Sequence, residues 1–478
     1  QGAAFAACGY AQAKEECACA YATSGPGAIN LLSGVADAYY DSLPVIFLTG
    51  QLNTYEYSGI KGLRQQGFQE TDIVAVAKPI TKYAVQIRNP EDIVEELNKA
   101  YHIATTGRRG PVLIDLPMNI QRSEVENPVY DMTFEDKHTD AAAAQQAADT
   151  ILEALEQAKR PVIMLGHGVD SSFSQQKLIR FAQKRQIPII TSVLAKSVLG
   201  YDHPLNFGCI GGAYGHRYAN MIANAKSDLL LCFGISLCTR QIGTKVHEFA
   251  RGAKIIRIDI DPYNLQRDIH ENGINEVKLQ AETGAVIDCL AKAAAPDTEG
   301  ISDWLNVCTE IKENLQAVDD ATPERYPNRM IADLSDMLED TSAIAVDVGQ
   351  HMVWSYQSFK NHEGQKLLFS GGHGAMGYGL PAAIGAYYAT GKPTACICGD
   401  GALQMNIQEL EWVKRENLPI KIMVMNNEAL GMIRHLQRDY FDCLFAGTTD
   451  GCGFASCDFS KVEAAYGIPS CRMHCEDV

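Results

Sequence analysis

Two polar groups that end neighbouring hydrophobic runs constrain the fold of this chain most strongly. Asp400 follows the run 394–398, and the pair Asn426-Asn427 follows the run 421–425. One helix plus one strand fits between the two groups, so the runs are predicted to be parallel strands whose carboxyl ends lie side by side. A carboxylate and a carboxamide at that edge can share one hard divalent cation such as Mg²⁺. The glycines on either side of Asp400 are equally typical of a plain turn.

Composition excludes several other classes of protein. The 478 residues are 46 % hydrophobic and 21 % charged, and the formal net charge is −17. An acidic chain is poorly suited to nucleic acid or an anionic membrane as a partner. No apolar run reaches the roughly twenty residues that a transmembrane helix needs. An ordinary acidic cytosolic protein is sufficient to explain this composition.

The cysteine pattern favours free thiols in a reducing cytoplasm. The count of fifteen is odd, and several cysteines fall in hydrophobic runs, where a buried thiol behaves as a small hydrophobe. These are Cys17, Cys19, Cys232, Cys396 and Cys398. The late cysteines at 443, 452, 457, 471 and 475 invite a metal interpretation, but they form no CxxC pair and no usual zinc spacing.

Strands alternate with helices in three blocks, which predicts an α/β fold of three doubly wound parallel-sheet domains. We place these domains at 1–125, 141–295 and 325–478, and we interpret the polar stretches 122–140 and 295–300 as linkers. The predicted strands are 17–22, 44–48 and 111–115 in the first block, 162–165, 188–191, 229–232 and 254–260 in the second, and 343–347, 367–370, 394–398 and 421–425 in the third.

The central block carries a weak nucleotide-binding signal. Gly166-His-Gly168 follows a predicted strand and resembles half of a dinucleotide-binding turn, but the third glycine is missing. Asp259 and Asp261 end a later strand, where a carboxylate can accept a ribose hydroxyl. An ordinary solvated strand end is the alternative.

A glycine-rich loop in the third block is the most unusual segment. The residues 370–379 include five glycines, which reduce steric cover so that a ligand can approach the main chain. Met376 within this loop is either a core plug or a wedge beneath a flat cofactor. Upstream, Gln350 and His351 follow a strand and can donate hydrogen bonds to phosphate oxygens, or they belong to an ordinary exposed turn.

These segments together resemble acetohydroxyacid (acetolactate) synthase and its close relatives among thiamine-diphosphate enzymes. The likeness rests on 347–351, 370–386 and 398–432 in the third block, and on 22–30, 41–50, 68–72 and 104–117 in the first. It covers essentially the whole chain. It implies a pyrimidine-binding domain, a central Rossmann-like domain and a diphosphate-binding domain, in that order.

The resemblance also implies roles for individual residues. The implied Mg²⁺ ligands are Asp400, Asn427 and the carbonyl of Ala429. The residues implied to hold the diphosphate are Gln350, His351, Gly401 and Ala402. The remaining cofactor contacts are implied for the main chain of Gly374 and Met376, for the Met376 side chain, which would hold the cofactor bent, and for Met432. Phe68 and Gln69 would face the site from a partner subunit.

The reaction that the resemblance implies is a decarboxylating carboligation. Pyruvate would lose carbon dioxide, and its remaining two carbons would join a second 2-oxoacid to give a 2-hydroxy-3-oxoacid of branched-chain amino acid biosynthesis. Thiamine diphosphate and Mg²⁺ are the implied cofactors, and a cytoplasmic homodimer or homotetramer with shared active sites is the implied assembly. The alternatives are another 2-oxoacid decarboxylase, an acyl-CoA lyase or an acetyltransferase with the same cofactor, and a non-catalytic relative that keeps only the fold.

The chain departs from the family pattern at several positions. The family's catalytic glutamate would stand just before Gln1, and both ends look truncated, so the chain as given is expected to be inactive. Leu436 stands where family members that use 2-oxobutyrate commonly place a tryptophan. Cys238-Thr239 replace an acidic pair of the flavin-binding domain, which leaves FAD open as a further cofactor. His373 is another substitution, in the glycine-rich loop.

Overall fold

The described residues of this chain form three separate β-sheets. The computed structural model describes residues 1–60, 62–126, 128, 130, 134, 140–169, 171–294 and 302–473. The chain forms two compact units, one of residues 1–136, 343–349 and 368–470, and the other of residues 137–342, 350–367 and 471–478. The predicted α/β fold with three parallel sheets is confirmed. The boundaries 1–125, 141–295 and 325–478 stay predictions.

The first sheet belongs to the first unit. Its strand order is β1 (Ala18–Ala22), β2 (Val45–Gln51), β4 (Val112–Pro117) and β3 (Tyr83–Gln86), and neighbouring strands are parallel. The inner strand β4 is almost wholly buried, as expected for a parallel strand with both faces covered. Its helices are α1 (Gly2–Lys14), α2 (Pro26–Asp41), α3 (Ile73–Ala77), α4 (Ile93–Thr105) and α5 (Met118–Gln121).

The central sheet has six strands and lies in the second unit. Their order is β10 (Glu276–Gln280), β9 (Lys254–Asp259), β8 (Leu229–Phe233), β5 (Pro161–Leu165), β6 (Ile189–Thr191) and β7 (Asn206–Cys209). The helices are α6 (Ala141–Gln157), α7 (Ser172–Arg185), α8 (Arg217–Asn220) continued by η5 (Met221–Lys226), α9 (Thr239–Ile242), α10 (Pro262–Gln266), α11 (Thr283–Ala291), α12 (Ser302–Asn314), α13 (Pro327–Met337) and α14 (Gln350–Ser358).

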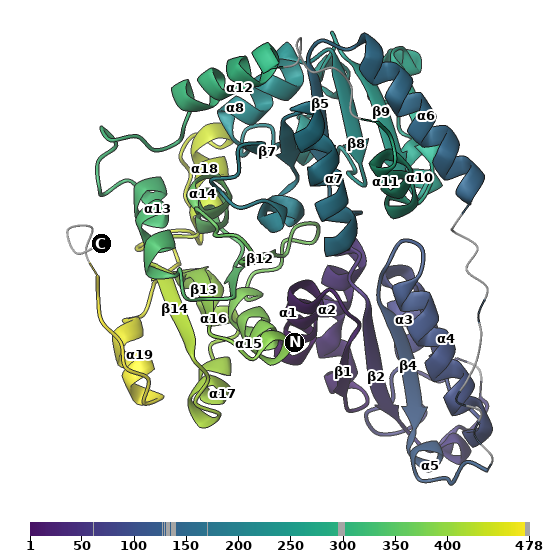
Figure 1. Cartoon of the computed structure of the whole chain (residues 1–478). Helices are drawn as coiled ribbons and strands as arrows, with labels where there is room; N and C mark the ends of the chain where they lie inside the picture. Colours follow the sequence, from purple (N-terminus) through teal and green to yellow (C-terminus); the bar gives the residue numbers. More distant parts are fainter. Residues whose placement is uncertain are drawn as a thin grey trace. The chain divides into compact units, whose positions relative to one another are not determined.

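Alternating residues of the central strands face two different cores. Ile163 and Leu165 pack in one cluster with residues of α6, α7 and α11, whereas Val162 and Met164 pack in another with residues of α8, η5 and α12. Helices therefore cover both faces of this sheet (Figure 1). This period of two along buried strands is why the sequence shows continuous apolar runs and no apolar–polar alternation.

The third sheet returns to the first unit. Its strand order is β12 (Lys366–Phe369), β11 (Ala343–Val346), β13 (Thr394–Gly399) and β14 (Ile420–Met425). The helices that follow are α15 (Gly379–Thr390), α16 (Asp400–Met405), α17 (Glu409–Arg415), α18 (Gly431–Tyr440) and α19 (Phe459–Ala465).

Helices α1 and α15, far apart in sequence, lie side by side (Figure 1). The contact is close because glycines replace side chains where the backbones meet. A Cβ on Gly9 would come within 2.3 Å of the Ala382 carbonyl oxygen, and one on Gly385 within 1.8 Å of the Ala6 carbonyl oxygen. Any larger residue at either position would force the two helices apart.

Two sequence predictions about local structure need correction or fall outside the described residues. Cys19 is exposed, and Cys17 precedes β1 and is only half-buried. The reason is that β1 is an edge strand whose alternate side chains face away from the core. Most of the linker 122–140, the interval 295–300 and Cys475 lie outside the described residues. Among the described residues, no helix is long and apolar enough to cross a bilayer.

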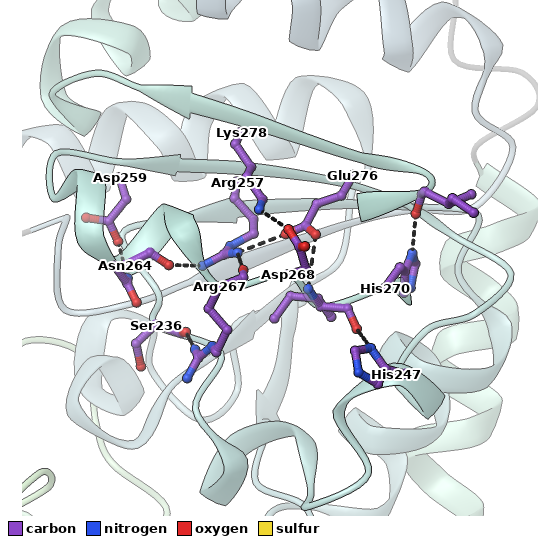
Figure 2. A network of polar contacts seen from close by, with 12 residues as sticks. Ser236, His247, Arg257, Asp259, Asn264, Arg267, Asp268, His270, Glu276 and Lys278 are labelled. Carbon is purple, nitrogen blue, oxygen red and sulfur yellow. Dashed lines mark hydrogen bonds and ion pairs between the residues drawn. The ribbon is translucent and has the colours of Figure 1, made fainter. Parts of the chain in front are cut away.

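A buried polar network ties the end of the central sheet together (Figure 2). The guanidinium of Arg257, on β9, pairs with the carboxylate of Glu276, on β10, at 2.8 Å. It also donates to the carbonyls of Asn264 and Arg267, each at 2.6 Å. The second carboxylate oxygen of Glu276 accepts the Ile269 N–H at 3.0 Å. One ion pair thus anchors the whole segment between the two strands.

Candidate cofactor and metal site

Asp400 and the Asn426-Asn427 pair lie at neighbouring strand ends, as their spacing predicts. Strands β13 and β14 pair in parallel with Gly399 opposite Met425. Asp400 is the next residue after Gly399 and opens α16, and Asn426 is the next residue after Met425. The carboxylate and the carboxamides therefore leave the same edge of the third sheet.

The Asp400 carboxylate has a buried oxygen with no hydrogen-bond partner among the described residues. The residue is 2 % exposed, and the orphaned atom is Oδ2. Burial raises the pKa of this carboxyl, and hydrogen bonds from backbone N–H groups, that of Gly401 first, oppose the rise. An unpaired buried carboxylate oxygen is costly. A divalent cation bound there would remove that cost, so the residues present fit Mg²⁺.

Hydrogen bonds from nearby main-chain N–H groups fix the orientation of the Asn426 and Asn427 carboxamides. The Asn426 Oδ1 accepts from the Glu428 N–H at 3.1 Å and from the Ser456 hydroxyl at 3.2 Å. The Asn427 Oδ1 accepts from the Ala429 N–H at 3.2 Å, and Glu428 between them has a left-handed φ of 54°. A carboxamide oxygen carries two lone pairs and is a common ligand of hard divalent cations.

The glycine-rich loop meets this edge of the sheet at Gly401. A Cβ placed on Gly401 would lie 3.5 Å from the Met376 methyl, 2.6 Å from Leu430 Cδ2 and 3.7 Å from the Phe454 ring. Met376 is half-buried in this position. The structure therefore brings the loop that carries Met376 next to Asp400 and Gly401, which follow Met376 by 24 and 25 positions in the chain.

Asp347 fixes the end of the glycine-rich loop, a role that the sequence did not reveal. Its buried carboxylate accepts the N–H of Gly377 at 2.9 Å and that of Gly379 at 2.7 Å. Burial raises the pKa of Asp347 to about 6, against the lowering effect of these backbone hydrogen bonds. An acceptor-only side chain at a strand end, upstream of a loop rich in free N–H groups, is the signal that could have identified it.

Some main-chain groups in the middle of the loop have no hydrogen-bond partner among the described residues. The N–H of Gly374 donates to the Ser370 hydroxyl at 3.0 Å. No described residue donates to the Gly374 carbonyl or accepts from the Met376 N–H. Gly374 has a φ of 72° with open space on the side where a Cβ would stand. An acceptor and a donor two residues apart match the edge of a 4-aminopyrimidine, which presents an amino group and a ring nitrogen.

The other predicted site residues are placed as follows. Gln350 and His351 are the first two residues of α14, and Ala402 is buried in α16. Met432 is half-buried in the first turn of α18, and Ala429 is 5 % exposed. Phe68 is 84 % exposed, and Gln69 packs its carbonyl against Gly25. No hydrogen bond among the described residues links Phe68 or Gln69 to the glycine-rich loop.

In the central sheet, the glycines and the carboxylate that suggested a nucleotide-binding turn contact other parts of the chain. Gly166 and Gly168 pack on the backbone of Gly234, where a Cβ on Gly166 would lie 2.1 Å from the Gly234 carbonyl oxygen. The Asp259 carboxylate accepts from the Asp261 N–H at 2.9 Å and from the Asn264 side chain at 2.6 Å. These groups are thus used within the chain, and FAD stays a prediction.

Metal-binding clusters of another kind do not occur in the part of the chain that the structure describes. No group of three or more His, Cys, Asp or Glu side chains is arranged to hold a metal ion there. The metal site argued above needs only one carboxylate, because carboxamide, carbonyl, water and phosphate oxygens supply the other ligands of Mg²⁺.

Comparison with known families assigns all three parts of the chain to one class of enzyme. Residues 1–76 match the N-terminal TPP binding domain of thiamine pyrophosphate enzymes, residues 148–290 match the central domain, and residues 347–477 match the C-terminal TPP binding domain. The fold and the site therefore define a thiamine-diphosphate-dependent enzyme.

Relatives narrow the class further. The chain is 36 % identical to a probable acetolactate synthase large subunit of Methanocaldococcus jannaschii, over 99 % of this chain and 80 % of the relative. It is 35 % identical to a probable chloroplastic acetolactate synthase 2 of Oryza sativa subsp. japonica (99 % and 72 %), and 33 % identical to the acetolactate synthase isozyme 1 large subunit of Escherichia coli K12 (100 % and 81 %). The chain belongs to the acetolactate synthase large-subunit family.

Proposed function

We propose that this protein decarboxylates pyruvate and joins the remaining two carbons to a second 2-oxoacid, as an acetolactate synthase would. The observation that carries the proposal is the buried, unpartnered Asp400 oxygen at the strand edge where the Met376 loop arrives. A site with these parts suits a magnesium diphosphate beside a flat ring. The relatives are named acetolactate synthases, and acetolactate is the product that two molecules of pyruvate would give in this reaction.

The metal and the diphosphate would be held by groups at the third sheet. When bound, thiamine diphosphate supplies the electron sink for loss of carbon dioxide from a 2-oxoacid. Asp400, Asn427 and the Ala429 carbonyl would ligate Mg²⁺. The groups proposed to hold the diphosphate are Gln350, His351, Gly401 and Ala402.

The ring end of the site would be held by the glycine-rich loop. The Gly374 carbonyl would accept a hydrogen bond from the ring's amino group, and the Met376 N–H would donate to a ring nitrogen. The Met376 side chain, which the structure places against Gly401, would support the bent shape of the cofactor. Met432, in the first turn of α18, would border the same space.

We also propose a homodimer or homotetramer in the cytoplasm, in which Phe68 and Gln69 face the site of a partner subunit. The 84 % exposure of Phe68 supports a contact outside its own chain. The free, buried thiols of Cys8, Cys232 and Cys396 are compatible with a reducing compartment.

A 2-oxoacid decarboxylase with the same cofactor is the second candidate. Leu436 favours it, because this residue lies on α18 with 49 % of its surface exposed and offers no rigid aromatic face to an acceptor substrate. Acetolactate formation from pyruvate distinguishes the two candidates, since a simple decarboxylase would release acetaldehyde instead.

Calorimetric titration with thiamine diphosphate and Mg²⁺ tests the site itself. Asp400→Ala should abolish the Mg²⁺-dependent part of cofactor binding, because the remaining carboxamide and carbonyl ligands leave the cation short of negative charge. Asp320→Ala, which removes an exposed carboxylate in the other unit, serves as the matched control. Unchanged cofactor affinity in Asp400→Ala would contradict the assignment.

A further inference from the structure

Helix α2 holds the start of the glycine-rich loop through hydrogen bonds that its last turn accepts, although it precedes the loop by more than three hundred residues. We call this set of hydrogen bonds, from loop N–H groups to Asp41 and Ser370, the grip. The Asp41 carboxylate accepts the N–H of Gly371 at 2.8 Å and that of Gly372 at 2.6 Å. Asp41 is 2 % exposed. A Cβ on Gly372 would lie 2.8 Å from the Tyr40 Cβ, so the approach requires glycine. The helix end therefore lies directly against the loop backbone.

Ser370 extends this grip to the middle of the loop. Its fully buried hydroxyl donates a short hydrogen bond to Asp37, one turn before Asp41 on α2. The same oxygen accepts the N–H groups of Gly374 and Ala375, each at 3.0 Å. Four loop N–H groups thus point inward to two side-chain acceptors. The Gly374 carbonyl and the Met376 N–H are among the main-chain groups of the loop for which no described residue supplies a partner.

We propose that Asp41 and Ser370 are positioning residues that preorganise the glycine-rich loop for the aminopyrimidine of thiamine diphosphate. They do not touch the cofactor themselves. By consuming the inward N–H groups, they turn the Gly374 carbonyl and the Met376 N–H toward the ligand before it binds, so less ordering free energy is lost on binding. The consequence for the cofactor rests on the proposed function, whereas the order of the loop is a property of the chain alone.

Asp37 provides a matched control on the same helix. It contacts the loop only through the Ser370 hydroxyl, which an amide oxygen can accept equally well, and its Oδ2 has no partner among the described residues. Asp37→Asn therefore removes a buried titratable carboxyl without removing an acceptor of a loop N–H. Asp41→Asn also removes a buried titratable carboxyl, but it places an NH₂ group against one of the two glycine N–H groups.

Hydrogen–deuterium exchange of the cofactor-free protein tests the grip directly. In Asp41→Asn and Ser370→Ala, the peptide 370–377 should exchange about 10- to 100-fold faster, as expected when a hydrogen bond to a buried acceptor is lost. Asp37→Asn should exchange at the wild-type rate. Thermal unfolding of each variant shows whether it folds, and Ser370→Ala serves if Asp41→Asn does not.

Cofactor binding then tests the purpose of the grip. The Kd for thiamine diphosphate with Mg²⁺ should rise at least about tenfold in Asp41→Asn and Ser370→Ala and stay within about twofold in Asp37→Asn. Wild-type exchange in both loop variants, or equally fast exchange in Asp37→Asn, would overturn the proposal. Faster exchange without a change in Kd would also overturn it. If wild type itself bound no thiamine diphosphate, the proposed function would fail, while the exchange rates would still decide the grip.

Discussion

Removing one partner of the buried Arg257–Glu276 pair should destabilise the central sheet strongly. The two side chains are 2 % and 0 % exposed. In Glu276→Ala the guanidinium keeps only the carbonyl acceptors of Arg267 and Asn264, and the N–H of buried Ile269 loses its acceptor. An uncompensated buried charge costs about 3–5 kcal/mol, and an orphaned buried N–H costs about 1–3 kcal/mol. Because the site relaxes as one unit, we expect a loss of about 4–6 kcal/mol.

The free energy of unfolding in urea, read from hydrogen exchange of peptides in β9 and β10, measures this loss. Glu248→Ala is the control, because the Lys245–Glu248 pair is 3.5 Å apart with side chains 77 % and 59 % exposed, and an exposed pair contributes little. Replacing both buried partners by apolar residues, Arg257→Met with Glu276→Leu, should recover most of the stability. A loss in Glu276→Ala as small as that in Glu248→Ala would refute the reasoning.

Three further outcomes are expected. Met376→Ala should lower turnover more than cofactor affinity, because a misplacement of about 1 Å can cost on the order of 100-fold in rate; equal losses in kinetics and calorimetry would indicate packing instead. Leu436→Trp should raise the preference for 2-oxobutyrate over pyruvate about tenfold or more in a competition assay, since packing one methylene is worth about 1–3 kcal/mol; a strong native preference would contradict this. Burial raises the folded-state pKa of Asp41 to about 7 and that of Asp347 to about 6, from 3.8. These two carboxyl groups therefore bind more protons in the folded than in the unfolded chain between about pH 4 and pH 7, and their contribution to stability falls as the pH rises through that window. Asp41→Asn should flatten this slope in urea unfolding; an unchanged slope would show that Asp41 does not titrate there.

Every strand predicted from the sequence is present, and the three that were missed share one property. Strands β3, β7 and β10 each lie at the edge of a sheet. An edge strand is covered less completely, so its sequence carries less of the continuous apolar signal that marks an inner parallel strand. The half-buried residues of β3 and β10 illustrate this, and β7 is only four residues long. Partial burial accounts for β3 and β10, whereas β7 is buried and was missed because it is short; β14 is half-buried and was still predicted, because its sequence is a continuous apolar run apart from Lys421.

One part of the candidate site could be predicted from the sequence, and another part could not. The placement of Asp400 beside the Asn426-Asn427 turn followed from spacing alone, because strand–helix–strand connections determine which strand ends meet. The hydrogen bonds of Asp41 and Asp347 to the loop did not follow, because they join a side chain to the main chain of a distant segment. Neither the periodicity nor the composition of a sequence indicates which side chain will bond to which distant main-chain group. They became visible only when the folded chain brought the acceptors against the glycine N–H groups.

The bond between Asp37 and Ser370 spans 333 positions of the chain, and the first unit is completed by residues from both sides of the second. Closing a loop of this length costs conformational entropy, and this cost comes before the contacts that the closure allows, so such contacts form slowly. On a ribosome, α2 emerges long before its partner loop is synthesised. The ability to bind the cofactor should therefore appear late in biosynthesis, after the central sheet has had time to fold, so a nascent chain released before residue 372 would carry folded strands and no competent site.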